Sequence, residues 1–196
     1  MRAVLTLILI ICCMPVAGAQ RNDLGHWVAG NFSFSDELGG FRIVGISGRG
    51  TEQDPAIVTQ EISGLHESTL IVRAIQQLKP YVPSGSERSG FLFLKLVTLN
   101  HTGHPWIAFN LELQEKHQYP SVFGDGLSFD QLKYSVESFG SDIFNDHLAA
   151  FEPYDKLSFR GGSVNPAEAV TMSVLITDFT PRPRFYLRQD PVIPMF

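Results

Sequence analysis

Glycine and proline divide this chain into short segments. Its 196 residues include 17 glycines and 12 prolines, and the segments between them are rich in β-branched and aromatic residues. Several segments alternate apolar and polar side chains, which is the pattern of a strand with one buried face. Short strands of this kind, separated by turn residues, are typical of a β-sandwich or barrel. We therefore predict an all-β fold over residues 20–196, a single domain built as an antiparallel β-sandwich of the immunoglobulin-like or jelly-roll type.

The strand pattern recurs along the chain. We expect strands at 26–34, 41–47, 56–62, 68–78, 91–99, 106–113, 169–178 and 184–190. The segment "FLFLKLVTL" at 91–99 is apolar on nearly both faces, so we expect it in the middle of a sheet. The alternation in 106–113 and 169–178 predicts these inward-facing residues: Ile107, Phe109, Leu111, Leu113, Val170, Met172, Val174 and Ile176. It predicts these outward-facing ones: Ala108, Asn110 and Glu112.

The region between residues 114 and 159 lacks clean alternation because glycine and aspartate interrupt it repeatedly. We predict an irregular, partly helical insertion there. One helical turn is expected at Ser128–Tyr134 and another at Asp142–Leu148, with Ser141 as the N-cap of the second. A long loop of this size inside a compact domain is usually either functional or poorly ordered.

The first 19 residues have the composition of a secretory signal peptide. Arg2 gives a positive start, an apolar core follows at 3–14, and small residues at 17–19 mark the cleavage point. The apolar core is too short for a stable transmembrane span. A lipoprotein signal is the alternative, because Cys12 and Cys13 lie in this stretch, although an isoleucine precedes them where a small residue is usual. We predict cleavage after residue 19 and a secreted, periplasmic or extracellular location.

Cleavage would remove both cysteines and leave a mature chain without disulfide, thiol nucleophile or thiolate ligand. A domain of this length can bury an adequate core without a disulfide. The whole chain has a net charge of −5, and its densest basic stretch is "PRPRFYLR" at 181–188. Nucleic acids and anionic membranes are held by larger clusters of Lys and Arg, so we expect neither as a partner. After residue 19, no apolar run in the sequence approaches the length of a transmembrane helix.

The stretch "NHTGHPW" places His101 and His104 three residues apart. A zinc site needs three or four ligands, and a third would have to come from His117, His147 or a distant carboxylate. Gly103 and the proline that follows favour a turn instead. We predict a connection between two strands and not a zinc pair.

Aspartates in the irregular region suggest the one cofactor for which the sequence gives a reason, a structural calcium ion. Calcium takes several oxygen ligands from loops of this kind, although the spacing of an EF-hand is absent. The candidate ligands are Asp125, Asp130, Asp142 and Asp146. The alternative is that these side chains cap turns and short helices.

Aromatic side chains supply a second candidate site. Most of the 15 phenylalanines are expected in the core, because Phe buries well in a sandwich. Four larger rings lie nearer to predicted loops, where exposed aromatics could stack on sugars or dock on a protein partner. They are Trp27, Trp106, Tyr119 and Tyr154. The alternative is that these rings close the ends of the core.

Three stretches resemble parts of exported bacterial β-sandwich proteins. "NHTGHPWIAFNLEL" is similar to an Asn-x-Thr-Gly-x-x-Trp-x-x-Phe pattern, and "GGSVNPAEAVTMSVLITD" resembles a Gly-Gly-x-x-x-Pro-Gly-Glu turn and strand. "FSFSDELGGFRIVGISGRGTEQDP" looks like the opening of uncharacterised secreted alphaproteobacterial proteins. Many members of the wider group are ectodomains sorted by an exosortase tail. This chain departs from that pattern, with Ala167 where the turn often has glycine and no hydrophobic or basic sorting tail. The resemblance implies a sandwich fold and export, and it transfers no catalytic residue.

These observations favour an exported, non-catalytic β-sandwich protein of a binding or interaction type, with a glycan or a surface protein as partner. The alternative is a secreted hydrolase with its site in the 114–159 region. An enzyme should show a pocket with converging polar groups and shifted pKa values. A binding protein should show a grooved or flat face with exposed aromatics.

Overall fold

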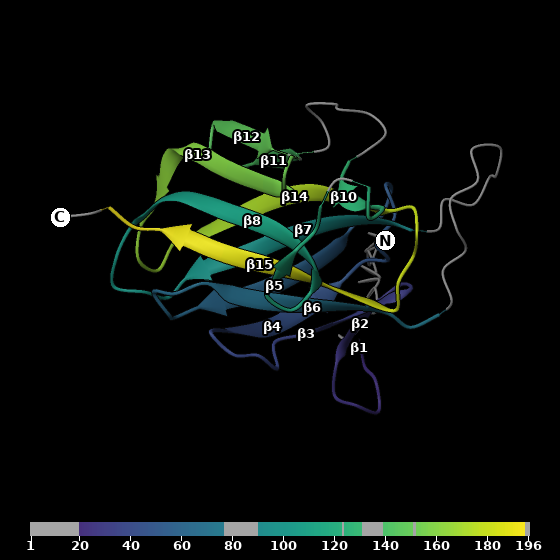
Figure 1. Cartoon of the computed structure of the whole chain (residues 1–196). Coiled ribbons are helices and arrows are strands. Elements are labelled where there is room, and N and C mark those ends of the chain that lie inside the picture. Colours follow the sequence, from purple (N-terminus) through teal and green to yellow (C-terminus); the bar gives the residue numbers. More distant parts are fainter. Residues whose placement is uncertain (1–19, 77–89, 123, 131–138, 151, 195–196) are drawn as a thin grey trace, which may run out of the picture.

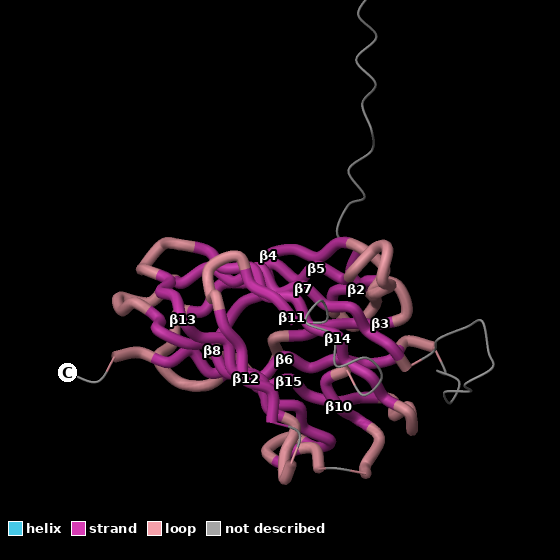
Figure 2. The backbone as a smooth tube through the Cα atoms, turned by 90° about the horizontal axis from the view of Figure 1, so that it is seen from above, coloured by secondary structure: helices cyan, strands magenta, loops and turns pink. Residues whose placement is uncertain are grey.

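The computed structural model describes residues 20–76, 90–122, 124–130, 139–150 and 152–194. Within these ranges the chain is all-β, without a helix, and forms two sheets (Figures 1 and 2). The predicted signal peptide and both cysteines fall on residues 1–19, outside the described residues. None of the described segments is a helix that is long and apolar enough to span a membrane.

The first sheet has nine strands in the described part of the chain. They are β1 (Gln20–Arg21), β2 (Trp27–Ala29), β3 (Phe32–Ser35), β6 (Ser68–Ala74), β8 (Trp106–Lys116), β9 (Tyr119–Pro120), β12 (Asp146–Ala150), β13 (Lys156–Val164) and β15 (Arg184–Val192). Their order is β1-β2-β3-β6-β15-β8-β13-β12, and β9 pairs with β8 beside this path. All of these pairings are antiparallel.

The second sheet has six strands in the same residues. They are β4 (Phe41–Ser47), β5 (Ala56–Ile62), β7 (Phe91–Asn100), β10 (Leu127–Phe129), β11 (Phe139–Ser141) and β14 (Ala169–Asp178). Their order is β10-β14-β7-β5-β4, and β11 also pairs with β14. The prediction of a wholly antiparallel fold is wrong at one ladder, because β5 and β7 run parallel. Between β5 and β7 the chain crosses to the first sheet and forms β6 there. When it returns to the second sheet, β7 runs in the same direction as β5.

The two sheets share one hydrophobic core, as expected of a β-sandwich. Buried core residues of the first sheet include Phe34, Leu70, Phe109, Leu111 and Leu187, and those of the second include Val58, Leu94, Leu96, Met172 and Ile176. A buried polar contact joins the sheets inside this core. Gln60 of β5 donates to Thr98 Oγ1 of β7 at 3.0 Å and forms an amide pair with Gln189 of β15. These side chains satisfy one another where water cannot reach them.

Several predicted strands are confirmed. The ranges 41–47, 56–62 and 169–178 match β4, β5 and β14. The apolar strand β7 lies between β14 and β5, in the middle of its sheet as expected.

The range 26–34 was expected to be one strand, and this prediction is wrong. The chain turns at Gly30, where φ is +56°, and forms the β2–β3 hairpin. A Cβ atom on Gly30 would lie 2.0 Å from the carbonyl oxygen of Arg49, so only glycine fits there.

The inward-facing prediction for β14 is confirmed, whereas that for β8 fails at its first residues. Phe109 and the two leucines that follow at alternate positions are buried, but Ile107 is 44% exposed. The register between β8 and β13 shifts between Arg160 and Val164, opposite this end of β8. Trp106, which pairs with Val164, turns into the core and Ile107 turns outward.

In the described residues of the 114–159 region the expected helical turns are not found, and this prediction is corrected there. Ser128 lies in β10, and the second expected turn runs into β12. Ser141 does accept the N–H groups of Ile143 and Phe144 through Oγ, both at 3.3 Å, but no helical turn follows, so it is not the helix N-cap that was predicted. The chain then extends, because the open edges of β13 and β14 offer backbone partners that outweigh local helix preference. Residues 131–134 of the first expected turn lie outside the described residues.

Candidate binding groove

A groove of about 410 Å³ crosses the outer face of the first sheet, over β12, β13, β8 and β15. These strands are neighbours in that order, although they come from distant parts of the chain (Figure 1). The lining residues are Asn110, Leu111, Glu112, Leu148, Ala150, Lys156, Leu157, Ser158, Arg188 and Asp190. The volume lies within the range of small-ligand sites.

The pairing register arranges most of the lining in two rows across the sheet. The first row is Leu148, Ser158, Asn110 and Asp190, each paired with the next. The second row is Ala150, Lys156, Glu112 and Arg188, paired in the same way. Because residues two apart on a strand project from the same face, both rows project outward. The groove therefore has an apolar wall on β12 and a polar floor on the other three strands.

Glu112 lies at the centre of the second row. It faces outward as predicted, yet it is only 6% exposed because its neighbours cover it. Lys156 Nζ is 3.0 Å and Arg188 Nη1 is 3.5 Å from its Oε2, and Gln114 donates to its Oε1 at 2.9 Å. Burial raises the pKa of Glu112, but the hydrogen bonds from Gln114 and Lys156 outweigh it, so the pKa lies below its ordinary value. Glu112 is therefore ionised at neutral pH and both its oxygens are engaged.

The first row leaves more hydrogen-bonding capacity open to a ligand. Asn110 Nδ2 donates to Asp190 Oδ2 at 3.3 Å, and both side chains are half-buried. Ser158 is half-buried beside them. Within the lining, Lys156 and Arg188 balance the two carboxylates, so the groove as a whole is close to neutral.

Tyr154 is the aromatic candidate that adjoins the groove. It precedes Lys156 by two residues and is 40% exposed, and Lys156 Nζ lies 5.6 Å from the centre of its ring. Tyr154 also lines a shallow hollow with Val122, Glu152 and Pro153. The sequence left open whether this ring is exposed or closes the core, and it did not predict a position next to a groove.

The other aromatic candidates lie elsewhere. Trp106 is fully buried and packs 5.6 Å from the ring of Phe109, so its assignment as a ligand-binding residue is corrected. Trp27 is half-buried, with the guanidinium of Arg21 4.0 Å from its ring. Tyr119 is exposed on β9. The structure therefore does not bring the four rings together.

The four aspartates proposed as calcium ligands have protein partners or lie apart. Asp142 accepts the N–H of Thr171 at 2.8 Å, and Asp146 pairs with Arg160 at 2.9 Å. Asp130 is buried directly after β10. In the described ranges, no group of three or more His, Cys, Asp or Glu side chains is placed to hold a metal ion.

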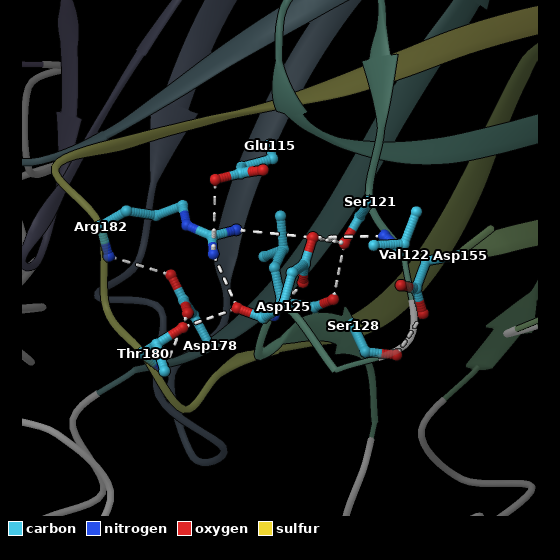
Figure 3. Close-up of polar contacts among 10 residues, drawn as sticks. Glu115, Ser121, Val122, Asp125, Ser128, Asp155, Asp178, Thr180 and Arg182 are labelled. Carbon is cyan, nitrogen blue, oxygen red and sulfur yellow. Dashed lines mark hydrogen bonds and ion pairs between the residues drawn. The ribbon is translucent and has the colours of Figure 1, made fainter. Parts of the chain in front are cut away.

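The remaining calcium candidate, Asp125, belongs to a polar cluster that fastens the 114–159 region to the β14–β15 connection (Figure 3). Arg182 Nη2 and Thr180 Oγ1 each donate to the carbonyl oxygen of Asp125 at 2.7 Å. The backbone N–H of Arg182 donates to Asp178 at 3.1 Å. Burial raises the pKa of Asp178, and the nearby Arg182 offsets part of this effect.

Asp155 lies on the other side of this cluster and is 1% exposed. Ser128 Oγ donates to its Oδ1, whereas its Oδ2 is buried and has no hydrogen-bond partner in the described structure. Burial raises the pKa of Asp155 to about 6; the charge of Asp125 acts in the same direction, and the nearby hydroxyls of Ser128 and Ser121 oppose it. This carboxyl fits its site better as the neutral acid.

The two histidines lie in the connection from β7 to β8, which carries the chain from the second sheet to the first. Asn100 Nδ2 donates to the carbonyl oxygens of His104 and Val164, both at 2.9 Å. Thr102 Oγ1 donates to Asn100 Oδ1 at 2.7 Å. The predicted turn is confirmed, and its asparagine holds it in place.

Sequence reasoning did not single out the charged residues of the groove. "KLSFR" and "RFYLRQD" do alternate, with Lys156 and Ser158 in the first and Arg188 and Asp190 in the second at polar positions. That signal shows which residues share a face of one strand. It does not show that β13 and β15 flank β8.

Comparison of the chain with protein-family models, with curated proteins and with solved structures gave no match. The resemblance to exported bacterial β-sandwich proteins stays a prediction from the quoted motifs.

Proposed function

We propose that this chain is an exported, non-catalytic binding protein of the immunoglobulin-like or jelly-roll sandwich type, and that its groove binds a glycan. The observation that carries the proposal is the pair of polar rows on the floor of the groove, bounded by Leu148 and adjoining the exposed ring of Tyr154. Export predicts that mass spectrometry of the secreted protein finds Gln20 at its N-terminus. An acylated Cys12 or Cys13 would contradict the export route.

A glycan fits the chemistry of the floor. Sugar hydroxyls both donate and accept hydrogen bonds, and Asn110, Ser158 and Asp190 together offer both functions. The balance of charge in the lining favours a neutral ligand. A protein partner is favoured less, because the groove has the volume of a small-ligand site, whereas a stable protein interface spreads over about 800 Å² on each side.

The state of Glu112 supports a binding role over catalysis. A glycosidase uses one carboxylic acid with a raised pKa and one free carboxylate. Glu112 has a lowered pKa, and its oxygens are held by Lys156, Arg188 and Gln114. It is therefore neither a proton donor nor a free nucleophile.

A glycan array with the purified mature protein, followed by calorimetric titration of the ligands found, tests the proposal. Asp190→Ala and Asn110→Ala should each weaken binding about tenfold, since each removes a hydrogen-bonding group from the floor. Arg160→Ala is the matched control, because Arg160 lies on the same face of β13 outside the groove lining. Absence of any glycan ligand, or equal affinity in the floor variants and the control, would contradict the proposal.

A secreted hydrolase remains the second candidate because of Asp155. A carboxyl whose pKa is raised to about 6 suits a general acid, and Asp155 lies in the 114–159 region. Its burial opposes this role, since a catalytic acid must reach the substrate. Screening with chromogenic glycosides and esters separates the candidates: hydrolysis that Asp155→Asn abolishes would favour the enzyme.

A further inference from the structure

Tyr154 stands where the groove meets a second hollow. Lys156 lines the groove and lies over the Tyr154 ring, while Tyr154 itself lines the hollow with Val122 and Pro153. Val122 forms a backbone bridge with Tyr154, which fixes the two against each other. The polar floor and the hollow therefore adjoin through the contact of Lys156 with the ring of Tyr154.

The two surfaces differ in chemistry. The floor of the groove is polar and presents donors and acceptors from Asn110, Ser158 and Asp190. The hollow is formed by Val122, Pro153 and the tyrosine ring, with one carboxylate at Glu152. A ligand that spans both needs hydroxyl groups at one end and a flat apolar face at the other. Sugars joined through equatorial bonds have this property, because their axial C–H groups form a flat face on each ring.

We propose that the groove and the hollow form one extended site for a neutral, linear, equatorially linked oligosaccharide, with Tyr154 stacked on a sugar unit beyond the groove. This inference rests on the proposed glycan-binding function. The groove holds one end of the chain by hydrogen bonds, and the tyrosine ring adds apolar contact with the next units. Affinity should then rise with the length of the oligosaccharide, and this rise should require the ring of Tyr154.

Calorimetric titration with cellulose fragments and chitin fragments, each from the monosaccharide upward, tests the inference. In the unaltered protein, affinity for at least one series should rise with chain length. Tyr154→Ala should weaken binding of the longest fragment about tenfold and leave the shortest binding fragment unchanged, because only the long chain reaches the ring. Tyr154→Phe keeps the ring and should retain the length dependence. Tyr119→Ala removes an exposed tyrosine on β9, outside both linings, and should change nothing.

The outcomes are distinguishable. If short fragments bind and longer ones gain nothing, or if Tyr154→Ala weakens all lengths equally, the extended site is wrong while the groove stands. Equal binding of starch fragments, whose linkage is axial, would overturn the equatorial preference. If no fragment of any series binds although the glycan array finds a ligand, the equatorially linked class is wrong; if the array also finds no ligand, the glycan-binding function itself fails.

Discussion

The central strands and the 114–159 region share one apolar core, but they differ in how many buried polar contacts they make. In β8 and β14, alternate side chains enter a shared apolar core, and the stabilisation is proportional to the area that they bury. In the 114–159 region, the short strands also place Phe129 and Phe139 in this core, but buried polar groups hold them in addition, with Arg182 reaching in from the β14–β15 connection (Figure 3). Apolar burial is indifferent to pH, whereas buried carboxyls are not. Two regions of one all-β fold should therefore respond differently to the same perturbation.

The backbone around Asp155 shows how closely the polar region is joined to the core. The N–H of Leu113, at the buried end of β8, donates to the carbonyl oxygen of Asp155 at 3.0 Å. Asp155 in turn donates its N–H to Ser121 at 3.3 Å. The backbone of Asp155 is therefore bonded both to β8 and to the segment before β10.

The largest loss of stability is expected from a substitution in the apolar core. Phe109→Ala should lower the free energy of unfolding by about 3–5 kcal/mol, because it removes a fully buried ring that packs on Trp106. Urea denaturation should show this loss with little change between acidic and neutral pH. A loss below about 1 kcal/mol would mean that the core can collapse around the cavity, and the contrast with the polar region would disappear.

The next largest loss of stability is expected where Arg182 of the β14–β15 connection contacts Asp125 of the 114–159 region. Arg182→Met should cost about 3 kcal/mol, since it removes the donor to the Asp125 carbonyl and the positive charge near Asp178. The pKa of Asp178 should rise further in this variant. Arg160→Met is the control: it breaks an exposed ion pair with Asp146 and should cost less than about 1 kcal/mol. Equal losses in the two variants would show that the buried cluster contributes no more than a surface pair.

Asp155→Asn should stabilise the protein, and its effect should depend on pH. The pKa of Asp155 is about 6 in the folded chain, against 3.8 for the ordinary group. Below about pH 4 the carboxyl is neutral in both the folded and the unfolded state, and no penalty exists. As the pH rises through the pKa that Asp155 has in the folded chain, its buried carboxyl ionises, and the folded state loses the stability that it has with the neutral acid. At about pH 8 the variant should therefore be more stable than the parent by about 2 kcal/mol, and at about pH 4 by little.

Thermal melts of the parent and the variant across this pH range provide the measurement. A stabilisation that is equal at all pH values would indicate better packing and not relief of a buried charge. A loss of stability near pH 8 would mean that the ionised carboxylate has favourable partners, and it would remove the physical basis for the raised pKa.

The sequence was sufficient for strands whose two faces differ in polarity. β5 and β14 were predicted with their observed ends, because each is a run rich in apolar and β-branched residues that proline-containing or polar connecting segments bound. β13 was missed because Gly161 and Gly162 read as a turn. In the fold, a Cβ atom on Gly162 would lie 2.5 Å from the carbonyl oxygen of Ile143, so the glycine allows a close approach of two backbone segments.

The groove required information that a single sequence does not contain. Alternation shows that Asn110 and Glu112 share a face, and this was predicted. That Asp190 lies on one side of Asn110 and Ser158 on the other depends on the strand order β15-β8-β13, which follows from long-range pairing. For Trp106 the sequence left two interpretations open, and the structure agrees with the one in which the ring closes the core; the shifted register lies in its partner strand.

The smallest expected effect tests that register shift directly. Ile107 and Phe109 are equivalent in the sequence pattern, but Ile107 is largely exposed and Phe109 is buried. Ile107→Ala should therefore cost less than about 1 kcal/mol, several times less than Phe109→Ala, because the isoleucine has little area to return to water. Urea denaturation of the two variants side by side measures the ratio. Similar losses would place Ile107 in the core, as the uninterrupted alternation expected from sequence requires. The shift in the β8–β13 register between Arg160 and Val164 would then be wrong.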